Sequence, residues 1–384
     1  MNTGRDHRID FFRGLALIFI FWDHIPQNVL GLITPRNVGF SDAAEIFVFL
    51  AGYASVLAYG KVMQRDGYLV GCLRVLRRAW VLYVAHIFLL AVLMGIVFTA
   101  NDHIETRNIS QEMGLDYFLA NPQQALIDEL LLRFKPNLMD PLPLYIVLLL
   151  SLPVVLPLLL RRVDVAVGLS LLLYVLVQAF GWNFNGLPPD GKWYFNPLAW
   201  QVIFVLGGAA AVMAQREPIT TPAQRRRGAL FFVSMAYLAV CALVALSWKW
   251  QPLHDALVPE SVAQLIYPIS KTDLSPVRLL HFMALAYCVP LLLARGPWLQ
   301  TWPAQQLCRM GRYSLEVFCL GVLLAPLADF TNSLNGDTLA ASLFTAVLGV
   351  VLMALLALWL DFNKRLNAPQ KAPAAAAPLT ATPS

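Results

Sequence analysis

An arginine and a histidine lie eleven residues apart in the first apolar segment of the chain. Arg13 and His24 belong to a stretch that runs from Asp10 to His24 and is otherwise mostly apolar. Ionisable groups are costly inside a membrane helix and by default indicate a function. An imidazole titrates near neutral pH and can act as a general base, while a guanidinium can hold an anionic group. The pair suits a reaction whose donor arrives from one side of a membrane and whose base lies deeper.

On an α-helix, eleven residues amount to about three turns at roughly 100° per residue, so Arg13 and His24 are expected on one face. Their separation along the axis would be about 16 Å at 1.5 Å per residue. Asp23 points about 100° away from His24. It could face another helix, and its role in the chemistry stays open.

Two acids, Asp42 and Glu45, open the second apolar segment at positions i and i+3. They share a helical face at a depth comparable to that of His24. A carboxylate there could orient the imidazole and stabilise its charged form. The alternative is structural: Asp42 would only cap the helix, and Glu45 would pair with Arg36.

Three arginines, Arg74, Arg77 and Arg78, precede the third apolar segment. Arg74 and Arg77 at i and i+3 present two guanidinium forks suited to phosphates, at the mouth where a nucleotide-bearing donor would dock. The alternative is an ordinary positively charged anchor on the inner side. No glycine-rich phosphate-binding loop accompanies them, which disfavours ATP-driven chemistry.

On the opposite side, Lys271 and Arg278 are cations in a region otherwise poor in them. They are candidates for binding an anionic ligand group, unless they simply snorkel at the interface. Asn196 and Trp200 open the sixth apolar segment among aromatic residues and could contact a carbohydrate. The aromatic residues of these loops fit either an interfacial belt or stacking platforms for sugar rings.

Composition sets the class of protein. Of the 384 residues, 58% are hydrophobic and 13% charged, and the mean hydropathy is +0.62. A soluble domain has about 25% charged residues, so the chain is predicted to be an all-α polytopic membrane protein. Its five cysteines show neither the pattern of a disulfide framework nor zinc-site spacing. The net charge of +5 is spread over short loops and does not indicate nucleic-acid binding.

Ten segments are long enough to cross a bilayer, which takes about 20 apolar residues each. The first is expected to be a retained span and not a cleaved signal peptide. With both termini inside, the inner segments hold 20 of the 28 Lys and Arg residues, so we predict an N-in, C-in orientation. We expect one integral-membrane domain over 1–365, a helix within 122–134 of an outer loop, and a disordered cytoplasmic tail over 366–384. The predicted spans are 11–33, 41–60, 79–100, 142–160, 164–182, 198–214, 228–247, 277–294, 314–333 and 339–360.

Several strings of the chain together carry a resemblance to a known family. The Arg13 to His24 spacing followed by Arg74 and Arg77 resembles the transmembrane acyltransferase-3 superfamily. The strings RIDFFRGLALIFIFWDHIPQN, GFSDAAEIFVFLAGY, WYFNPLAWQ, KTDLSPVRLLHF and GRYSLEVF resemble its OpgC-type branch. That branch succinylates osmoregulated periplasmic glucans of Gram-negative bacteria. The resemblance implies a multi-pass protein of the bacterial inner membrane, with His24 as the catalytic base and Arg74 and Arg77 as contacts for coenzyme A.

The implied reaction uses succinyl-CoA as the acyl donor, with no permanently bound cofactor and no metal. The partners would be acyl-CoA, a periplasmic glucan and membrane lipids. His24 would act as a general base or through an acyl-histidine intermediate, assisted by Glu45 and Asp23. Arg13, Arg74, Arg77 and Arg78 would bind the donor. The substrate contacts would be Asp42, Lys271, Arg278, Asn196 and Trp200.

A second hypothesis is a proton-coupled secondary transporter of an anionic metabolite that uses Arg13, His24 and Glu45 as its relay. Such a transporter should show interrupted spans at corresponding positions of two halves. A scaffold for glucan synthesis is a third possibility, but it leaves the intramembrane histidine unexplained. The reacting sugar hydroxyl, the selectivity between succinyl and acetyl, and the oligomeric state stay open.

Overall fold

The computed structural model describes residues 6–104, 106–187, 191–216 and 221–367. Within these ranges the regular structure is helical, and the only β-pairing is two isolated bridges. The first half contains α1 His7–Asp23, η1 Val29–Ile33, η2 Pro35–Asn37, α2 Ala43–Asp66, α3 Tyr68–His103, α4 Ile109–Glu112, α5 Asp116–Ala120, α6 Pro122–Leu130, α7 Pro141–Arg161 and α8 Val163–Phe180. The second half contains α9 Pro197–Ala214, α10 Pro222–Arg227, α11 Ala229–Ser247, α12 Gln251–Leu257, α13 Glu260–Ile266, α14 Pro276–Leu292, η3 Pro297–Gln300, α15 Trp302–Arg312, α16 Ser314–Leu334 and α17 Leu339–Leu366.

Eight described helices are long and apolar enough to cross a membrane. They are α2, α3, α7, α8, α9, α11, α16 and α17, and they make the chain a multi-pass membrane protein. The other two predicted spans are also helical, but α1 and α14 have 17 residues each. That length is at the lower end of what a crossing needs.

Two predicted boundaries are wrong. The first helix ends at Asp23 and does not continue to residue 33, because Pro26 disfavours helical backbone in the residue before it. His24 is therefore the C-cap of α1 and not a residue of the helix interior. The predicted inner loop 61–78 is mostly helical: α2 continues to Asp66, and α3 begins at Tyr68 after Gly67, whose positive φ of 95° turns the chain.

The predicted outer loop 101–141 contains three short helices, α4 to α6, of which α6 confirms the expected helix within 122–134. The end of the predicted tail, from residue 368 onward, lies outside the described residues.

Close helix packing depends on glycines at a few crossings. A Cβ on Gly52 of α2 would lie 1.9 Å from the carbonyl oxygen of Phe204 in α9, and a Cβ on Gly207 of α9 would lie 2.0 Å from that of Phe49. A Cβ on Gly14 of α1 would likewise lie 2.0 Å from the carbonyl oxygen of Leu307 in α15. Small residues let helix backbones approach closely in membrane proteins. These contacts fix α1 and α2, the two helices that carry the candidate catalytic residues.

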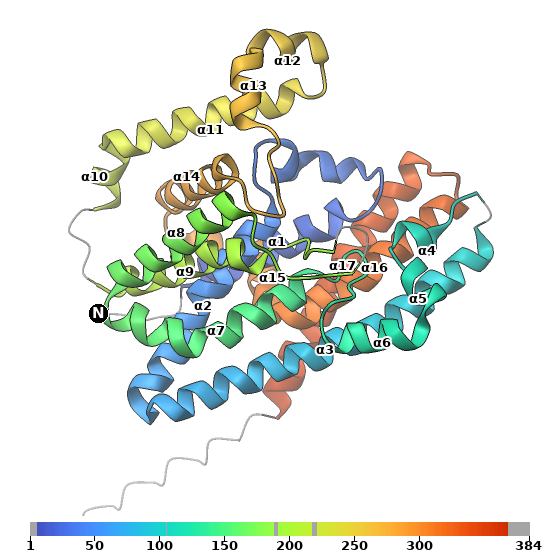
Figure 1. The fold of residues 1–384 in the computed structure, drawn as a ribbon, viewed down its shortest axis with the longest axis horizontal. Helices are drawn as coiled ribbons and strands as arrows, with labels where there is room; N and C mark the ends of the chain where they lie inside the picture. The colour runs from blue at the N-terminus through green and yellow to red at the C-terminus, as the bar shows by residue number, and fades with distance from the viewer. Residues whose placement is uncertain (1–5, 105, 188–190, 217–220, 368–384) are drawn as a thin grey trace, which may run out of the picture.

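Helices α11 to α13 stand apart from the main bundle, beside α14 (Figure 1). They form a small buried cluster that includes Cys241 of α11, Val258 and Phe40, the last from the linker between α1 and α2. The remaining helices enclose one larger core.

Alternation of consecutive spans brings the end of α1 and the beginnings of α2, α7, α9 and α14 to one side of the bundle. Each crossing takes the chain to the other side, and an even number of spans separates each of these helix ends from the next, so all of them lie on the same side. The candidate site lies among them.

Candidate active site

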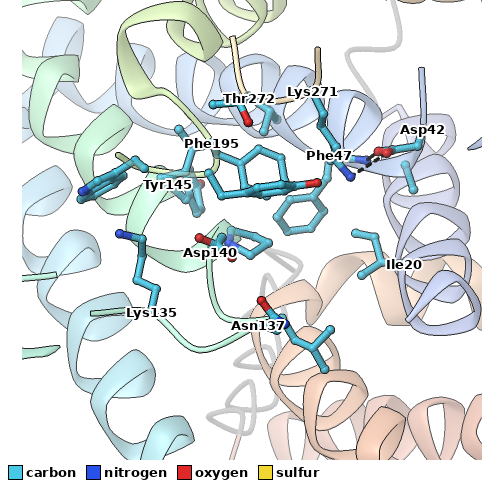
Figure 2. Close-up of a pocket in the computed structure, with 18 of the residues that line it drawn as sticks. Ile20, Asp42, Phe47, Lys135, Asn137, Asp140, Tyr145, Phe195, Lys271 and Thr272 are labelled. Carbon is cyan, nitrogen blue, oxygen red and sulfur yellow. Dashed lines mark hydrogen bonds and ion pairs between the residues drawn. The ribbon is translucent and has the colours of Figure 1, made fainter. Parts of the chain in front are cut away.

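A cavity of about 680 Å³ opens among these helix ends. Its wall combines residues from the end of α1, the start of α2, the loop before α7, the loop before α9 and the loop before α14 (Figure 2). It contains five of the residues predicted to form a site, namely Asp23, His24, Asp42, Lys271 and Arg278.

His24 is held by a backbone carbonyl. Its Nδ1 lies 2.6 Å from the carbonyl oxygen of Ile20, one turn earlier in α1. A carbonyl oxygen can only accept, so Nδ1 carries the hydrogen and the neutral ring keeps its lone pair on Nε2. The helix end thus fixes the tautomer that a general base requires.

Asp23 bonds away from His24, to the turn that follows α1. The hydroxyl of Thr34 lies 2.6 Å from its Oδ1, and Arg36 donates to its backbone carbonyl at 3.4 Å. The hydroxyl of Thr34 is also 2.8 Å from the carbonyl of Gly31 within the same turn. Asp23 therefore fixes the position of the linker beside His24.

Asp42 and Glu45 form a capping box at the start of α2. Asp42 accepts from the amide of Ala44 at 2.8 Å, and Glu45 accepts from the amide of Asp42 at 2.9 Å. This confirms the capping role that the sequence allowed for Asp42. Both side chains also accept from Arg278, which lies on α14, at 2.9 Å from Asp42.

The structure corrects the partner expected for Glu45. Its carboxylate is fully buried and is taken up by Arg278 and the capping box. It pairs neither with Arg36 nor, in any hydrogen bond of the described residues, with His24. The Ile20 carbonyl orients the imidazole instead.

Lys271 and Arg278, expected to receive an anionic group, are each already paired. Lys271 Nζ lies 2.6 Å from Asp42, while Arg278 bridges Asp42 and Glu45. The four groups form a neutral cluster of two acids and two bases. A buried charge needs such a partner because an isolated one is strongly disfavoured.

Asn196 and Trp200 are buried behind the cavity and are absent from its wall. Asn196 caps α9 through the amide of Leu198 and donates to Asp273 at 2.9 Å. Trp200 donates from its indole nitrogen to the carbonyl of Lys271 at 2.9 Å. Their hydrogen-bonding groups are thus used to hold the loop that carries Lys271, and a contact with a carbohydrate stays a prediction.

Part of the wall was not predicted. Lys135, Asn137 and Asp140 reach it from the loop before α7 (Figure 2). Lys135 Nζ lies 4.0 Å from the ring centroid of Trp193 and donates to a backbone carbonyl. Burial lowers the pKa of Lys135 to about 8 and raises the pKa of Asp140 to about 6. Their polar character directly ahead of a long apolar segment was the available sequence signal.

Aromatic rings of Trp193, Tyr194 and Phe195 complete this side of the wall. Polar groups beside aromatic rings are what a sugar needs, because its C–H surfaces pack on aromatic planes and its hydroxyls need hydrogen-bonding partners. Of the three rings, Tyr194 is the exposed one.

The predicted donor-binding arginines do not line the cavity. Arg13 donates to the hydroxyl of Ser314, the first residue of α16. Arg74 and Arg77 are exposed on α3, where Arg74 pairs with Asp66 at 3.5 Å. Arg78 is half-buried. These four arginines are thus not part of the cavity wall, and their contact with a donor stays a prediction.

A second, narrow space touches His24 from within the bundle. This crevice has a volume of about 10 Å³ and runs between α1, α16 and α17. Its wall is almost entirely apolar and includes Phe21, Phe318, Gly321 and Met353. His24 therefore lines both a wide cavity with polar and apolar walls and a narrow, almost entirely apolar crevice.

Comparison with known proteins supports the OpgC-type resemblance noted in the sequence. The searches of curated proteins and of solved structures gave no match. The family model described as OpgC protein matches residues 5–365, nearly the whole chain and all the helices that form the cavity. The chain belongs to the OpgC protein family.

Proposed function

We propose that this protein is a membrane O-acyltransferase that moves a succinyl group from cytoplasmic succinyl-CoA to hydroxyls of periplasmic glucans. The observation that carries the proposal is His24, which lines a cavity of mixed polar and aromatic residues and whose Nδ1 is held by the Ile20 carbonyl, so that Nε2 of the neutral ring is the nitrogen that can accept a proton. Membership of the OpgC family supports the choice of reaction.

The two spaces beside His24 suit two substrates that arrive from opposite sides. The cavity is wide enough for sugar units, whereas the crevice would have to open for the slender, nearly neutral pantetheine arm of coenzyme A. Coenzyme A is too highly charged to enter hydrocarbon. Arg13, Arg74, Arg77 and Arg78 would hold its phosphates at the inner surface.

In the simplest chemistry, a glucan hydroxyl attacks the thioester carbonyl carbon while His24 Nε2 removes the hydroxyl proton. The carbon–sulfur bond of the resulting tetrahedral intermediate then breaks. The thiolate of coenzyme A takes the proton from the imidazolium, and the succinyl ester remains on the sugar. In the covalent route Nε2 first attacks the carbonyl carbon, the carbon–sulfur bond breaks and the coenzyme A thiolate leaves. The glucan hydroxyl then attacks the same carbon, the carbon–nitrogen bond breaks to return the neutral imidazole, and the thiolate takes up the hydroxyl proton.

The transporter alternative lacks the expected structural feature. Prolines lie inside α7, α14 and α16, yet each of these helices is continuous. Among the described spans, none is interrupted as the sites of many transporters are.

The test is acyl transfer by purified protein in lipid vesicles, with succinyl-CoA and glucan, followed by mass spectrometry of the glucan. His24→Ala should abolish the mass increase of one succinyl group. His103→Ala is a matched control, since His103 makes the same bond to the carbonyl of Thr99 but lies exposed and outside the cavity. Near-normal transfer by His24→Ala at equal protein level would refute the assignment.

A further inference from the structure

The charges of the cavity wall single out the basic residues that could bind an anion. The wall contains Arg36, Lys135, Lys192, Lys271 and Arg278. Lys271 and Arg278 are neutralised by Asp42 and Glu45. Of the three that remain, one lies beside His24.

Arg36 lies on η2, in the linker that follows α1, and its side chain is exposed. It donates to the backbone carbonyl of Asp23, the neighbour of His24. It forms no ion pair with a carboxylate of the residues that the structure describes. A guanidinium has five N–H donors, so a fork suited to a carboxylate remains available.

The place of Arg36 fits the direction in which an acyl group would point. His24 contacts both the narrow crevice and the cavity. If coenzyme A reaches His24 through the crevice, the acyl chain on the far side of the thioester extends into the cavity. Two methylene groups separate the thioester carbonyl from the terminal carboxylate of a succinyl group, so the carboxylate stays near His24.

Lys135 is less suited to that role. Figure 2 shows Lys135 and Ile20 on opposite sides of the cavity, and Ile20 is the residue whose carbonyl holds His24. Lys135 is also engaged with the ring of Trp193 and with the carbonyl of Leu132.

We infer that Arg36 binds the terminal carboxylate of the acyl group and sets a preference for dicarboxylic over simple acyl donors. This inference rests on the proposed acyl transfer. Lys271 and Arg278, the other candidates for an anionic ligand group, are already paired with Asp42 and Glu45.

The experiment compares transfer rates with succinyl-CoA and acetyl-CoA for the full-length protein in lipid vesicles. A hydrogen bond to a charged group contributes about 1.5–3 kcal/mol, and a factor of ten corresponds to about 1.4 kcal/mol. Arg36→Gln should therefore lower the succinyl/acetyl rate ratio about tenfold to a hundredfold. Arg36→Lys should restore part of it.

Arg133→Gln is the matched control: this outer-loop arginine is exposed and outside the cavity wall, so its substitution should leave the ratio unchanged. Equal losses with both donors in Arg36→Gln, or a ratio that moves in Lys135→Gln but not in Arg36→Gln, would overturn the inference. A wild-type protein inactive with both donors would instead refute the proposed function itself.

Discussion

At the scale of single residues, the pairing of charges decides which groups can take part in chemistry. Arg278 is conspicuous in the sequence as a cation of the outer side, but its two carboxylate partners lie more than 230 positions earlier, at Asp42 and Glu45. Its charge therefore stabilises the junction of α2 and α14. The exposed Arg36 is less conspicuous, yet its charge remains available to a ligand.

We predict that Arg278→Gln destabilises the protein by about 3–5 kcal/mol, the usual cost of removing one partner from a buried ion pair. The reason is that Glu45, which is fully buried, would lose its cation. Adding Glu45→Gln should recover part of the loss, since no buried charge is then left without its partner. Unfolding of the two single variants and the double variant in detergent measures this coupling.

The double variant should lose less free energy of unfolding than the two single variants lose together, because the two residues interact. Additive losses would show that Arg278 and Glu45 act independently. In that case the charges of Lys271 and Arg278 should be reconsidered as available to substrate.

At the scale of elements, the turn between α1 and α2 positions the cation. Thr34 is fully buried, and its hydroxyl reaches Asp23 at the end of α1. Asn37 adds a hydrogen bond of 2.8 Å to the carbonyl of Gly31. The linker is thus tied to the end of α1 through Thr34 and folded on itself through Asn37.

Thr34→Val keeps the shape of the side chain but removes this hydroxyl, and Arg36 should become less well placed. A hydrogen bond contributes about 1 kcal/mol, which corresponds to about a fivefold effect. We expect the succinyl/acetyl rate ratio to fall by about that factor, mainly through a higher KM for succinyl-CoA. Thr99→Val, which removes a hydroxyl on the exposed side of α3, is the control and should change neither parameter.

A fall in kcat with both donors would mean that Thr34 acts on His24 and not on Arg36.

Much of the helical framework was predictable because hydropathy reports directly on burial in lipid. Even the closely spaced α7 and α8 were separated correctly at Arg161 and Arg162. The end of α1 was not, because the apolar run Val29–Ile33 continues the hydrophobic pattern after Pro26 while folding as a separate 3-10 turn.

The site was predictable only in part. His24 could be predicted because an ionisable imidazole within an apolar segment is energetically costly and by default indicates a function. The Ile20 carbonyl that fixes its tautomer could not be foreseen without knowing where the helix ends. Lys135 and Asp140 line the cavity because of the course of the loop that precedes α7. Local sequence patterns do not predict the course of such a loop.

At the scale of the whole molecule, the constriction below His24 has a consequence for the cell. Under the proposed function, a protein with a glucan cavity on one face and a donor entrance on the other must not join the two into a pore. The apolar crevice meets this need through Met353 and Phe21, both almost fully buried beside Gly321. Water and ions are excluded from so small an apolar space.

Under that proposal the same residues form a permeability barrier, and catalysis has to open it without dissipating the proton gradient. Met353→Ala should enlarge the crevice and let protons leak through vesicles that contain the variant, as a trapped pH-sensitive dye would report. Met213→Ala, at an exposed position of α9, should leave the vesicles tight. If Met353→Ala vesicles hold a pH gradient as well as the wild type, the seal lies elsewhere along the bundle. A leak would show that one thioether keeps a transmembrane enzyme from acting as an uncoupler.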